Sequence, residues 1–241
     1  YIYIKLSRLN RMKFFIKVML TLHEKLTKAH RFKTFQKSFL PEYKTNLSNT
    51  DLIIVGSDQV WNPTITNGYN DAYWGYLYHG IPHITYAVSC PSKYITKEQI
   101  PLLKNFKAIG VREQMAVAKL QTLNINAILT IDPTLLLNRK TWDELLKKNS
   151  PIKKKYIFSY NLSAIKELDM LAVILEKRYN LITKSPFKKS GPIEFVNWVY
   201  YSEYTLVSSF HGVAFSIIFH KPFVFFPNYD ERDERVLSLL Q

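Results

Sequence analysis

The stretch Leu52-Ile-Ile-Val-Gly-Ser-Asp-Gln-Val-Trp-Asn-Pro63 joins a short apolar run to a group of polar side chains and one tryptophan. The run is continuously apolar, which is typical of a buried parallel strand, and Gly56 lets the backbone turn directly after it. In α/β domains ligands bind where strands end. We therefore expect a binding site that includes Ser57, Asp58, Gln59, Trp61 and Asn62. On local sequence alone, Asp58 is equally well explained as a helix cap and Trp61 as a packing anchor.

Outward from this stretch, apolar runs alternate with helical patterns along the whole chain. Strands are predicted at 51–56, 83–88, 108–111, 127–131, 156–160, 181–183, 204–207 and 222–226. Helices are predicted at 10–37, 97–106, 113–123, 164–179, 194–201 and 211–220. This alternation predicts βα units with parallel sheets. A polar, proline-containing break near 138–155 predicts two α/β domains, residues 1–145 and 146–241, with a cleft between them.

Composition is that of an ordinary globular protein. The 241 residues are 47% hydrophobic, which is enough to bury a sizeable core. The single cysteine, Cys90, excludes an intrachain disulfide and is better explained as a small buried residue than as a nucleophile. No apolar run reaches the length of about 18 residues that a membrane span needs, and the opening residues lack signal-peptide features. We expect a cytoplasmic protein. Because the chain starts at Tyr1 and ends within a helical pattern, we also expect it to be truncated at both ends.

The net charge of +14 is concentrated near the N-terminus. Residues 1–44 contain eleven Lys or Arg against two Glu, interleaved with apolar residues at loose helical spacing. Three interpretations follow. A basic amphipathic helix is attracted to an anionic membrane surface, and a basic segment can also bind nucleic acid. The favoured interpretation is a solvated surface helix whose apolar side packs on the domain.

Two further segments carry groups suited to binding an anion. Arg112 follows the strand 108–111 at a helix start, where a guanidinium can meet an oxyanion, although a surface ion pair is the simpler explanation. His211 lies in Ser208-Ser-Phe-His-Gly212, where a strand turns into a helix. The first N–H groups of that helix and its dipole therefore point to the same place as the imidazole. Gly212 allows a ligand to approach closely.

Five blocks of sequence support a family resemblance. They are Gly56–Pro63, Tyr86-Ala-Val-Ser89, Val111-Arg-Glu113, Asp132-Pro133, and Ser208–Gly212 followed by Lys221-Pro222. In this order they resemble the polysaccharide pyruvyl transferase family over residues 51–235. The resemblance implies two Rossmann-like domains similar to GT-B glycosyltransferases, with the acceptor side in 1–145 and the donor side in 146–241. It also implies transfer of the enolpyruvyl group of phosphoenolpyruvate to sugar hydroxyls as a cyclic ketal, in exopolysaccharide and cell-envelope biosynthesis.

The resemblance also implies a set of site residues. Arg112 and His211 match two of the family's donor ligands, while Ser209 stands where the Arg-x-His form has arginine, with Phe210 beside it. Candidate substitutes for the missing cation are Lys221, Lys184, Lys188 and Lys189. We expect His211 to bind the donor and supply a proton, and Asp58 to act as base or to bind a sugar hydroxyl. The remaining donor-side expectations are Ser208, Ser209 and Gly212; the acceptor-side ones are Ser57, Gln59, Trp61 and Asn62.

Asp132, in contrast, is better explained as a cap than as a catalyst. No spacing of His and carboxylates predicts a metal site, since His79 and His83 have no evident third ligand. Phosphoenolpyruvate would be a substrate, so no cofactor is expected.

The expected partners are phosphoenolpyruvate and a saccharide or lipid-linked oligosaccharide, with peripheral contact at the inner face of the plasma membrane and no nucleic acid. Two alternatives remain: a GT-B-type glycosyltransferase using a nucleotide sugar, and a non-catalytic protein that binds carbohydrate or a membrane surface.

Overall fold

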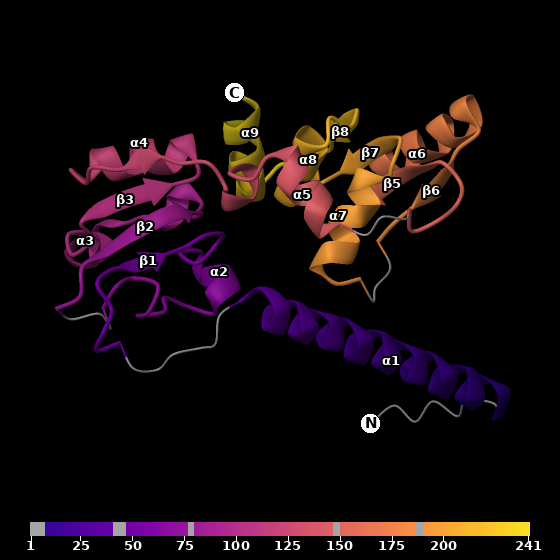
Figure 1. The fold of residues 1–241 in the computed structure, drawn as a ribbon, viewed down its shortest axis with the longest axis horizontal. Coiled ribbons are helices and arrows are strands. Elements are labelled where there is room, and N and C mark those ends of the chain that lie inside the picture. The colour runs from indigo at the N-terminus through magenta and orange to yellow at the C-terminus, as the bar shows by residue number, and fades with distance from the viewer. Residues whose placement is uncertain (1–7, 41–46, 77–79, 147–149, 187–189) are drawn as a thin grey trace.

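The structure is a computed structural model that describes residues 8–40, 47–76, 80–146, 150–186 and 190–241, with side chains from residue 13 onward. Its strands form two separate four-stranded parallel sheets, here named sheet A and sheet B (Figure 1). The prediction of an α/β fold with parallel sheets is therefore confirmed. Two such sheets with flanking helices are consistent with Rossmann-like architecture.

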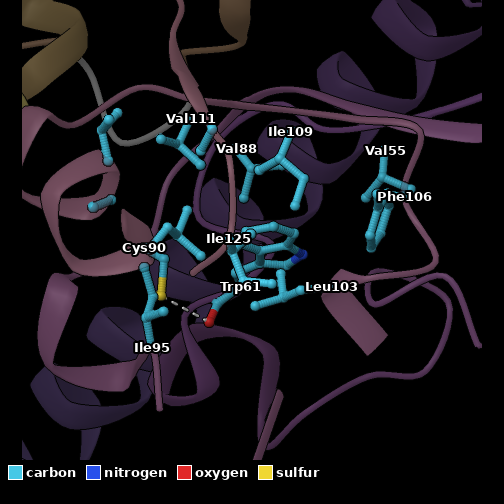
Figure 2. Packing of buried hydrophobic residues seen from close by; sticks show 14 of the residues in the cluster. Val55, Trp61, Val88, Cys90, Ile95, Leu103, Phe106, Ile109, Val111 and Ile125 are labelled. Carbon is cyan, nitrogen blue, oxygen red and sulfur yellow. Dashed lines mark hydrogen bonds between the residues drawn. The ribbon is translucent and has the colours of Figure 1, made fainter. Parts of the chain in front are cut away.

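Sheet A is built from the first half of the chain. Its strands in spatial order are β1 (Ile53–Val55), β2 (His83–Val88), β3 (Ala108–Val111) and β4 (Ile128–Leu129). The connecting helices are α2 (Pro63–Thr66), η1 (Ser92–Tyr94), η2 (Lys97–Gln99), α3 (Ile100–Leu103) and α4 (Gln114–Thr122). One face of the sheet packs on α3 and α4 through a buried cluster that includes Trp61, Ile109 and Leu120. Figure 2 shows Trp61 among Val88, Ile109 and Leu103 in this cluster.

The expectation that the first strand and the strand at 127–131 are fully buried is wrong. Ile54 and Ile128 are each 60% exposed, and Leu52, Leu129 and Ile131 are also exposed. β1 and β4 are the two edge strands of sheet A, so each has a neighbour on one side only. The apolar run alone could not distinguish an edge strand from a central one.

Sheet B is built from the second half. Its strands in spatial order are β6 (Ile182–Lys184), β5 (Tyr156–Tyr160), β7 (Tyr204–Val207) and β8 (Phe223–Phe225). Alternate residues of β5 enter two different clusters, because side chains of a strand point to opposite faces. Ile157 packs with α6 (Lys166–Tyr179), whereas Tyr156 and Phe158 pack with α7 (Pro192–Tyr200) and α8 (Phe210–Ile218). Helices thus cover both faces of sheet B.

The connection between the sheets packs with sheet B. It holds η3 (Pro133–Leu135) and α5 (Arg139–Leu145), and Leu135, Trp142 and Leu146 join the cluster under α8. The polar break predicted at 138–155 overlaps this segment, because that prediction rested on the lysine- and proline-containing residues 147–155. The domain boundary at 145/146 stays a prediction.

The last elements, η4 (Glu231–Asp233) and α9 (Glu234–Leu240), join the two halves of the molecule. Val236 is buried in the sheet B cluster. On the other side, Glu234 accepts hydrogen bonds from the backbone N–H and the hydroxyl of Ser92 (3.2 and 3.3 Å), and the hydroxyl of Ser238 accepts one from the Gln114 N–H (3.0 Å). Figure 1 shows α9 between α4 and α8.

The N-terminal helix α1 (Arg8–Phe39) does not pack as expected. It lies along the outside of the molecule, near α7 (Figure 1). Its apolar side chains, including Phe14, Phe15 and Leu26, remain exposed instead of packing on a domain. Neither α1 nor any other helix in the described ranges is long and apolar enough to cross a membrane.

The turn after β1 can be tested at Gly56. Its φ is +138°, and a Cβ built there would lie 2.1 Å from the carbonyl oxygen of Tyr86. We expect Gly56→Ala to destabilise the protein by about 2 kcal/mol or more, from backbone strain of roughly 1–3 kcal/mol plus this clash. Urea unfolding measures the change. Gly68→Ala is the control, because Gly68 also has a positive φ (+107°) but open space around it. Equal losses in both variants would mean that the contact with Tyr86 is unimportant.

Candidate functional site

The candidate site lies where strands of both sheets end. Asp58 follows β1, Arg112 follows β3, and Asp132 follows β4, all at the carboxyl edge of sheet A. His211 follows β7 of sheet B, at the start of α8. The strand ends thus bring together four residues that are far apart in the sequence, which is the usual location of ligand sites in parallel α/β sheets.

The Arg112 guanidinium is the centre of this group. Its side chain is 2% exposed and donates one hydrogen bond to Asp58 Oδ1 (2.8 Å) and another to Asp132 Oδ2. Its Cζ lies 4.4 Å from the ring centroid of Phe210, in cation–π contact across the two halves of the molecule. Arg112 Nε has no hydrogen-bond partner. The buried cation is therefore paired by two carboxylates, while its Nε–H donor is unused.

The two carboxylates that hold Arg112 differ in their surroundings. Asp132 is buried; its Oδ1 accepts hydrogen bonds from the backbone N–H (2.9 Å) and hydroxyl (2.7 Å) of Thr134, so it caps η3 as expected. The Asp58 side chain is 53% exposed. Burial by itself would raise the pKa of Asp58, but Arg112, together with His211 and Arg235, holds the pKa below its usual value. Asp58 is thus an ionised and solvent-accessible partner of Arg112, whereas Asp132 is a buried one.

His211 begins α8 beside these groups. Its Nε2 lies 4.0 Å from Asp132 Oδ2. Desolvation lowers the pKa of His211 below its usual value, against the opposing effect of Asp58 and Asp132. Ser209 is the N-cap of α8, and its hydroxyl accepts a hydrogen bond from the Gly212 N–H (3.1 Å). At Gly212 a Cβ would lie 2.8 Å from Val207 Cγ1, so only glycine fits against the end of β7.

Arg235 belongs to the site although the sequence pattern gave no sign of it. It lies on α9, its side chain is 14% exposed, and its Nη1 is 3.5 Å from Asp58 Oδ1. Desolvation and the nearby Arg112 lower its pKa. Arg235 places a second guanidinium beside Arg112 and His211. The sequence shows only that Arg235 is an arginine in a helical pattern near the end of the chain. That pattern does not indicate that its side chain lies at the cleft.

An open cavity of about 760 Å³ adjoins this cluster. Gln59, Ser209, His211 and Arg235 line its polar side. Its other walls are largely aromatic, with contributions from both halves of the chain and from α1: Phe32, Phe35, Trp142, Tyr160, Phe195, Phe210 and Phe215. Aromatic walls with a few convergent polar groups suit an organic ligand that also carries negative charge.

Three of the expected site residues have structural partners elsewhere. Trp61 is fully buried, stacks on Trp74 (4.6 Å between centroids) and donates to the Tyr73 carbonyl (2.8 Å). Asn62 caps α2 by accepting from the Thr64 N–H (3.1 Å). The Lys221 ammonium donates to the carbonyl of Ser202 (2.8 Å), a residue that precedes β7. Lys221 thus lies at the edge of sheet B where β7 begins, whereas His211 follows the end of β7. The structure therefore does not bring Trp61, Asn62 or Lys221 to the cavity.

The other expected residues have varied positions. Ser208 ties β7 to β5 by donating to the Tyr160 carbonyl (3.3 Å) and accepting from the Leu162 N–H (3.0 Å). Ser57 is half-buried in the turn before Asp58, and Lys184 ends the edge strand β6. Lys188, Lys189 and His79 lie outside the described residues. In the part of the chain that is described, no group of three His, Cys, Asp or Glu side chains is placed to hold a metal ion.

Cys90 is a packing residue, as expected. Its thiol is fully buried and donates to the Trp61 carbonyl at 3.2 Å, as the dashed line in Figure 2 shows. Desolvation raises the pKa of the thiol well above its usual value, which keeps it protonated.

Glu113 is a fully buried carboxyl group directly beside Arg112. Its Oε1 accepts a hydrogen bond of 2.5 Å from the Ser89 hydroxyl and lies 4.0 Å from Arg112 Nε. Desolvation raises the pKa of Glu113 to about 7, although Ser89 and Arg112 act in the opposite direction. Near neutral pH this group is therefore partly protonated, which reduces the negative charge around Arg112.

The Glu113 carboxyl group makes stability depend on pH. Its pKa in the folded protein is about 7, against a usual value of 4.5, so folding favours the protonated form. This contribution is present below pH 4.5 and is lost as the pH rises to about 7, by up to roughly 3 kcal/mol. As the pH rises from 5 to 8, the free energy of unfolding measured in urea should fall less for Glu113→Gln than for the wild type. The exposed Glu167→Gln is the control, and an equal pH dependence in wild type and Glu113→Gln would contradict the prediction.

Comparison with known proteins identifies one family. The family model described as polysaccharide pyruvyl transferase matches residues 2–231, which is nearly the whole chain. A search of curated proteins found no match. The matched range contains Asp58, Arg112, Asp132 and His211 but ends before Arg235. The chain belongs to the polysaccharide pyruvyl transferase family.

Proposed function

We propose that this protein transfers the enolpyruvyl group of phosphoenolpyruvate onto hydroxyls of a saccharide, forming a pyruvate ketal and releasing phosphate. The family assignment supports a transferase acting on polysaccharides. The observation that carries the choice of donor is the grouping of Arg235 and His211 at one edge of the cleft, with the buried Arg112 paired to the same Asp58 carboxylate as Arg235. A small ligand with both a phosphate and a carboxylate needs several fixed cationic donors of this kind.

Arg235 could replace the arginine that the sequence lacks beside His211. Ser209 and Phe210 occupy the region where the Arg-x-His form has its arginine, so that segment contributes no cation besides His211. Arg235, reaching the cleft from α9, restores the lost charge from a different element. Phe210 has another role, because its ring stacks on Arg112 and fixes the plane of that guanidinium.

Donor binding requires a rearrangement at Asp58. In the structure the Asp58 carboxylate is paired with Arg112 and lies close to Arg235. A bound anion must therefore compete with Asp58 for these two guanidinium groups. Asp132 is buried and held by Thr134, whereas the Asp58 side chain is half-exposed. The anion therefore displaces Asp58 rather than Asp132. The displaced carboxylate would then be available beside the donor as a general base.

The residues fit the proton transfers that ketal formation requires. One sugar hydroxyl adds to C2 of the enol while C3 gains a proton, and a second hydroxyl then displaces phosphate from C2. The protons lost by the two hydroxyls must be accepted, and the proton gained by C3 must be supplied. We assign the proton gained by C3 to His211 and acceptance of the first hydroxyl's proton to Asp58. The proton of the second hydroxyl leaves with the phosphate, and transfer of the proton held by Asp58 back to His211 restores both groups. Binding of the phosphate dianion beside His211 would raise its lowered pKa and favour the protonated acid.

The acceptor side follows from the shape of the cavity. Gln59 offers an amide beside aromatic walls that include Trp142 and Tyr160, and these groups suit the polar edges and apolar faces of sugar rings. We propose a GT-B-like arrangement with the active site between the two sheets. The proposal places the protein in the cytoplasm, in exopolysaccharide or cell-envelope biosynthesis.

Calorimetric titration tests the donor. We expect phosphoenolpyruvate to bind, and Arg235→Gln and His211→Asn each to weaken binding by roughly tenfold or more, since a charge-assisted hydrogen bond contributes about 1.5–3 kcal/mol. Arg178→Gln, on the outer helix α6, is the control and should bind as the wild type does. Binding of nucleotide sugars without phosphoenolpyruvate would instead identify a glycosyltransferase. Binding of saccharides alone, with no donor, would identify a non-catalytic carbohydrate-binding protein.

The same titration has an expected pH dependence. The lowered pKa of His211 leaves it neutral in the free protein near pH 7, and a bound anion favours its charged form. Binding should therefore tighten as the pH falls from 7.5 to 6.0, about tenfold per unit at most because a single proton is linked. His211→Asn removes this dependence and leaves only that of the ligand's own phosphate. Identical slopes in the two proteins would exclude His211 as the titrating group.

A further inference from the structure

Helix α1 contacts the rest of the protein along one narrow stripe. Between residues 13 and 40 the half-buried side chains are Glu24, Thr27, Arg31 and Phe35, while the others in that range are exposed. Their spacing of three or four residues places them on one side of the helix. Arg31 forms an ion pair with Glu194 of α7 (3.8 Å), which fixes this side against the molecule.

The opposite side of α1 is apolar. Phe14, Phe15, Val18, Met19, Leu22 and Leu26 recur at the spacing of one helix face, about half a turn away from the contact stripe. All six are at least 45% exposed, and the two phenylalanines are 63% and 64% exposed. We call these six residues the outer face of α1. These six side chains point away from the protein, whereas the stripe that meets it carries Glu24, Thr27 and Arg31 together with Phe35.

Charge indicates what covers the outer face. Residues 13–39 carry Lys13, Lys17, Lys25, Lys28, Arg31, Lys33 and Lys37 against the single acidic residue Glu24. A second copy of the same helix would bring like charges together. A nucleic acid would satisfy the lysines but would leave the apolar face in water. An anionic lipid surface satisfies both, since lysines contact headgroups while apolar side chains enter the acyl boundary.

We propose that α1 is a membrane-docking helix, which lies in the surface of an anionic bilayer with its outer face inserted. The sequence permitted this interpretation but favoured packing on the domain, and the direction of the contact stripe decides between them. The helix has 32 residues, so about 48 Å of helix lies along the surface without crossing it. Lysines beside the outer face extend toward the headgroups.

Docking also brings the active-site cavity close to the bilayer. Lys28, Phe32 and Phe35, near the C-terminal end of α1, line the cavity that contains His211 and Arg235. A saccharide attached to a membrane lipid could reach this cavity without leaving the surface. This conclusion, that the acceptor is lipid-linked, rests on the proposed function; the docking of α1 does not.

Vesicle co-sedimentation tests the docking with no substrate present. We expect the wild type to bind vesicles of phosphatidylcholine with 30% phosphatidylglycerol at least tenfold more tightly than pure phosphatidylcholine, with binding reduced by salt. The triple variant Phe14→Ser/Phe15→Ser/Met19→Ser should lose at least tenfold in binding to the anionic vesicles. The matched control is Met170→Ser/Val173→Ser/Ile174→Ser, which removes three exposed apolar side chains from α6 and should bind as the wild type does.

A charge variant and two further measurements complete the test. Lys25→Glu/Lys33→Glu should also lose at least tenfold, because these two exposed lysines lie on the side of the outer face and the substitutions reverse their charge. Circular dichroism and phosphoenolpyruvate titration of the triple variant separate loss of docking from loss of fold or of the donor site. The proposal would be overturned if the wild type did not bind anionic vesicles, or if the triple variant bound them as tightly as the wild type does. A dimer that dissociates in the triple variant, without lipid binding, would assign the outer face to a second copy.

Discussion

The arrangement of the site depends on the pairing of one buried guanidinium. Arg112 would be very costly to bury alone, and the carboxylates of Asp58 and Asp132 make its burial possible. Both carboxylates come from turns after strands of sheet A, and the ring of Phe210 comes from the start of α8. All three partners therefore meet at one side chain, Arg112. The local turns, the capping of η3 by Asp132 and the approach of sheet B are thereby linked.

The sequence was sufficient for the central elements of both sheets. The strands at 83–88, 108–111, 156–160 and 204–207 were predicted with the bounds that the structure has, because each is a short apolar run between turn residues. Edge strands and α5 were harder. An apolar run does not report whether it has neighbours on both sides, and burial at 52–54 and 127–131 was overestimated for this reason. The grouping of Asp58, Arg112 and His211 at strand ends followed from the order of the elements.

Other parts of the site depend on tertiary packing that no local pattern contains. Arg235 reaches the cleft because Val236, its neighbour on α9, is buried under α8. Trp61 seemed suited to a sugar ring, but in the core of sheet A its ring stacks on Trp74 and its N–H group donates to the Tyr73 carbonyl. The raised pKa of Glu113 arises from complete burial, which depends on helices that fold over it. A short sequence motif identifies the chemistry available at a turn, but it does not show which side chains face the cleft.

The position of α9 has a further consequence for recognition. This helix is hydrogen-bonded to η1 and α4 on one side and packed under α8 on the other. Two-lobed proteins often bind by closing a hinge, and part of the interaction free energy is then consumed in restricting that motion. Here the C-terminal helix has already restricted it when the chain folds. With both lobes held by α9, the donor binding proposed above would need the Asp58 carboxylate to give way to another anion and would not need the lobes to close.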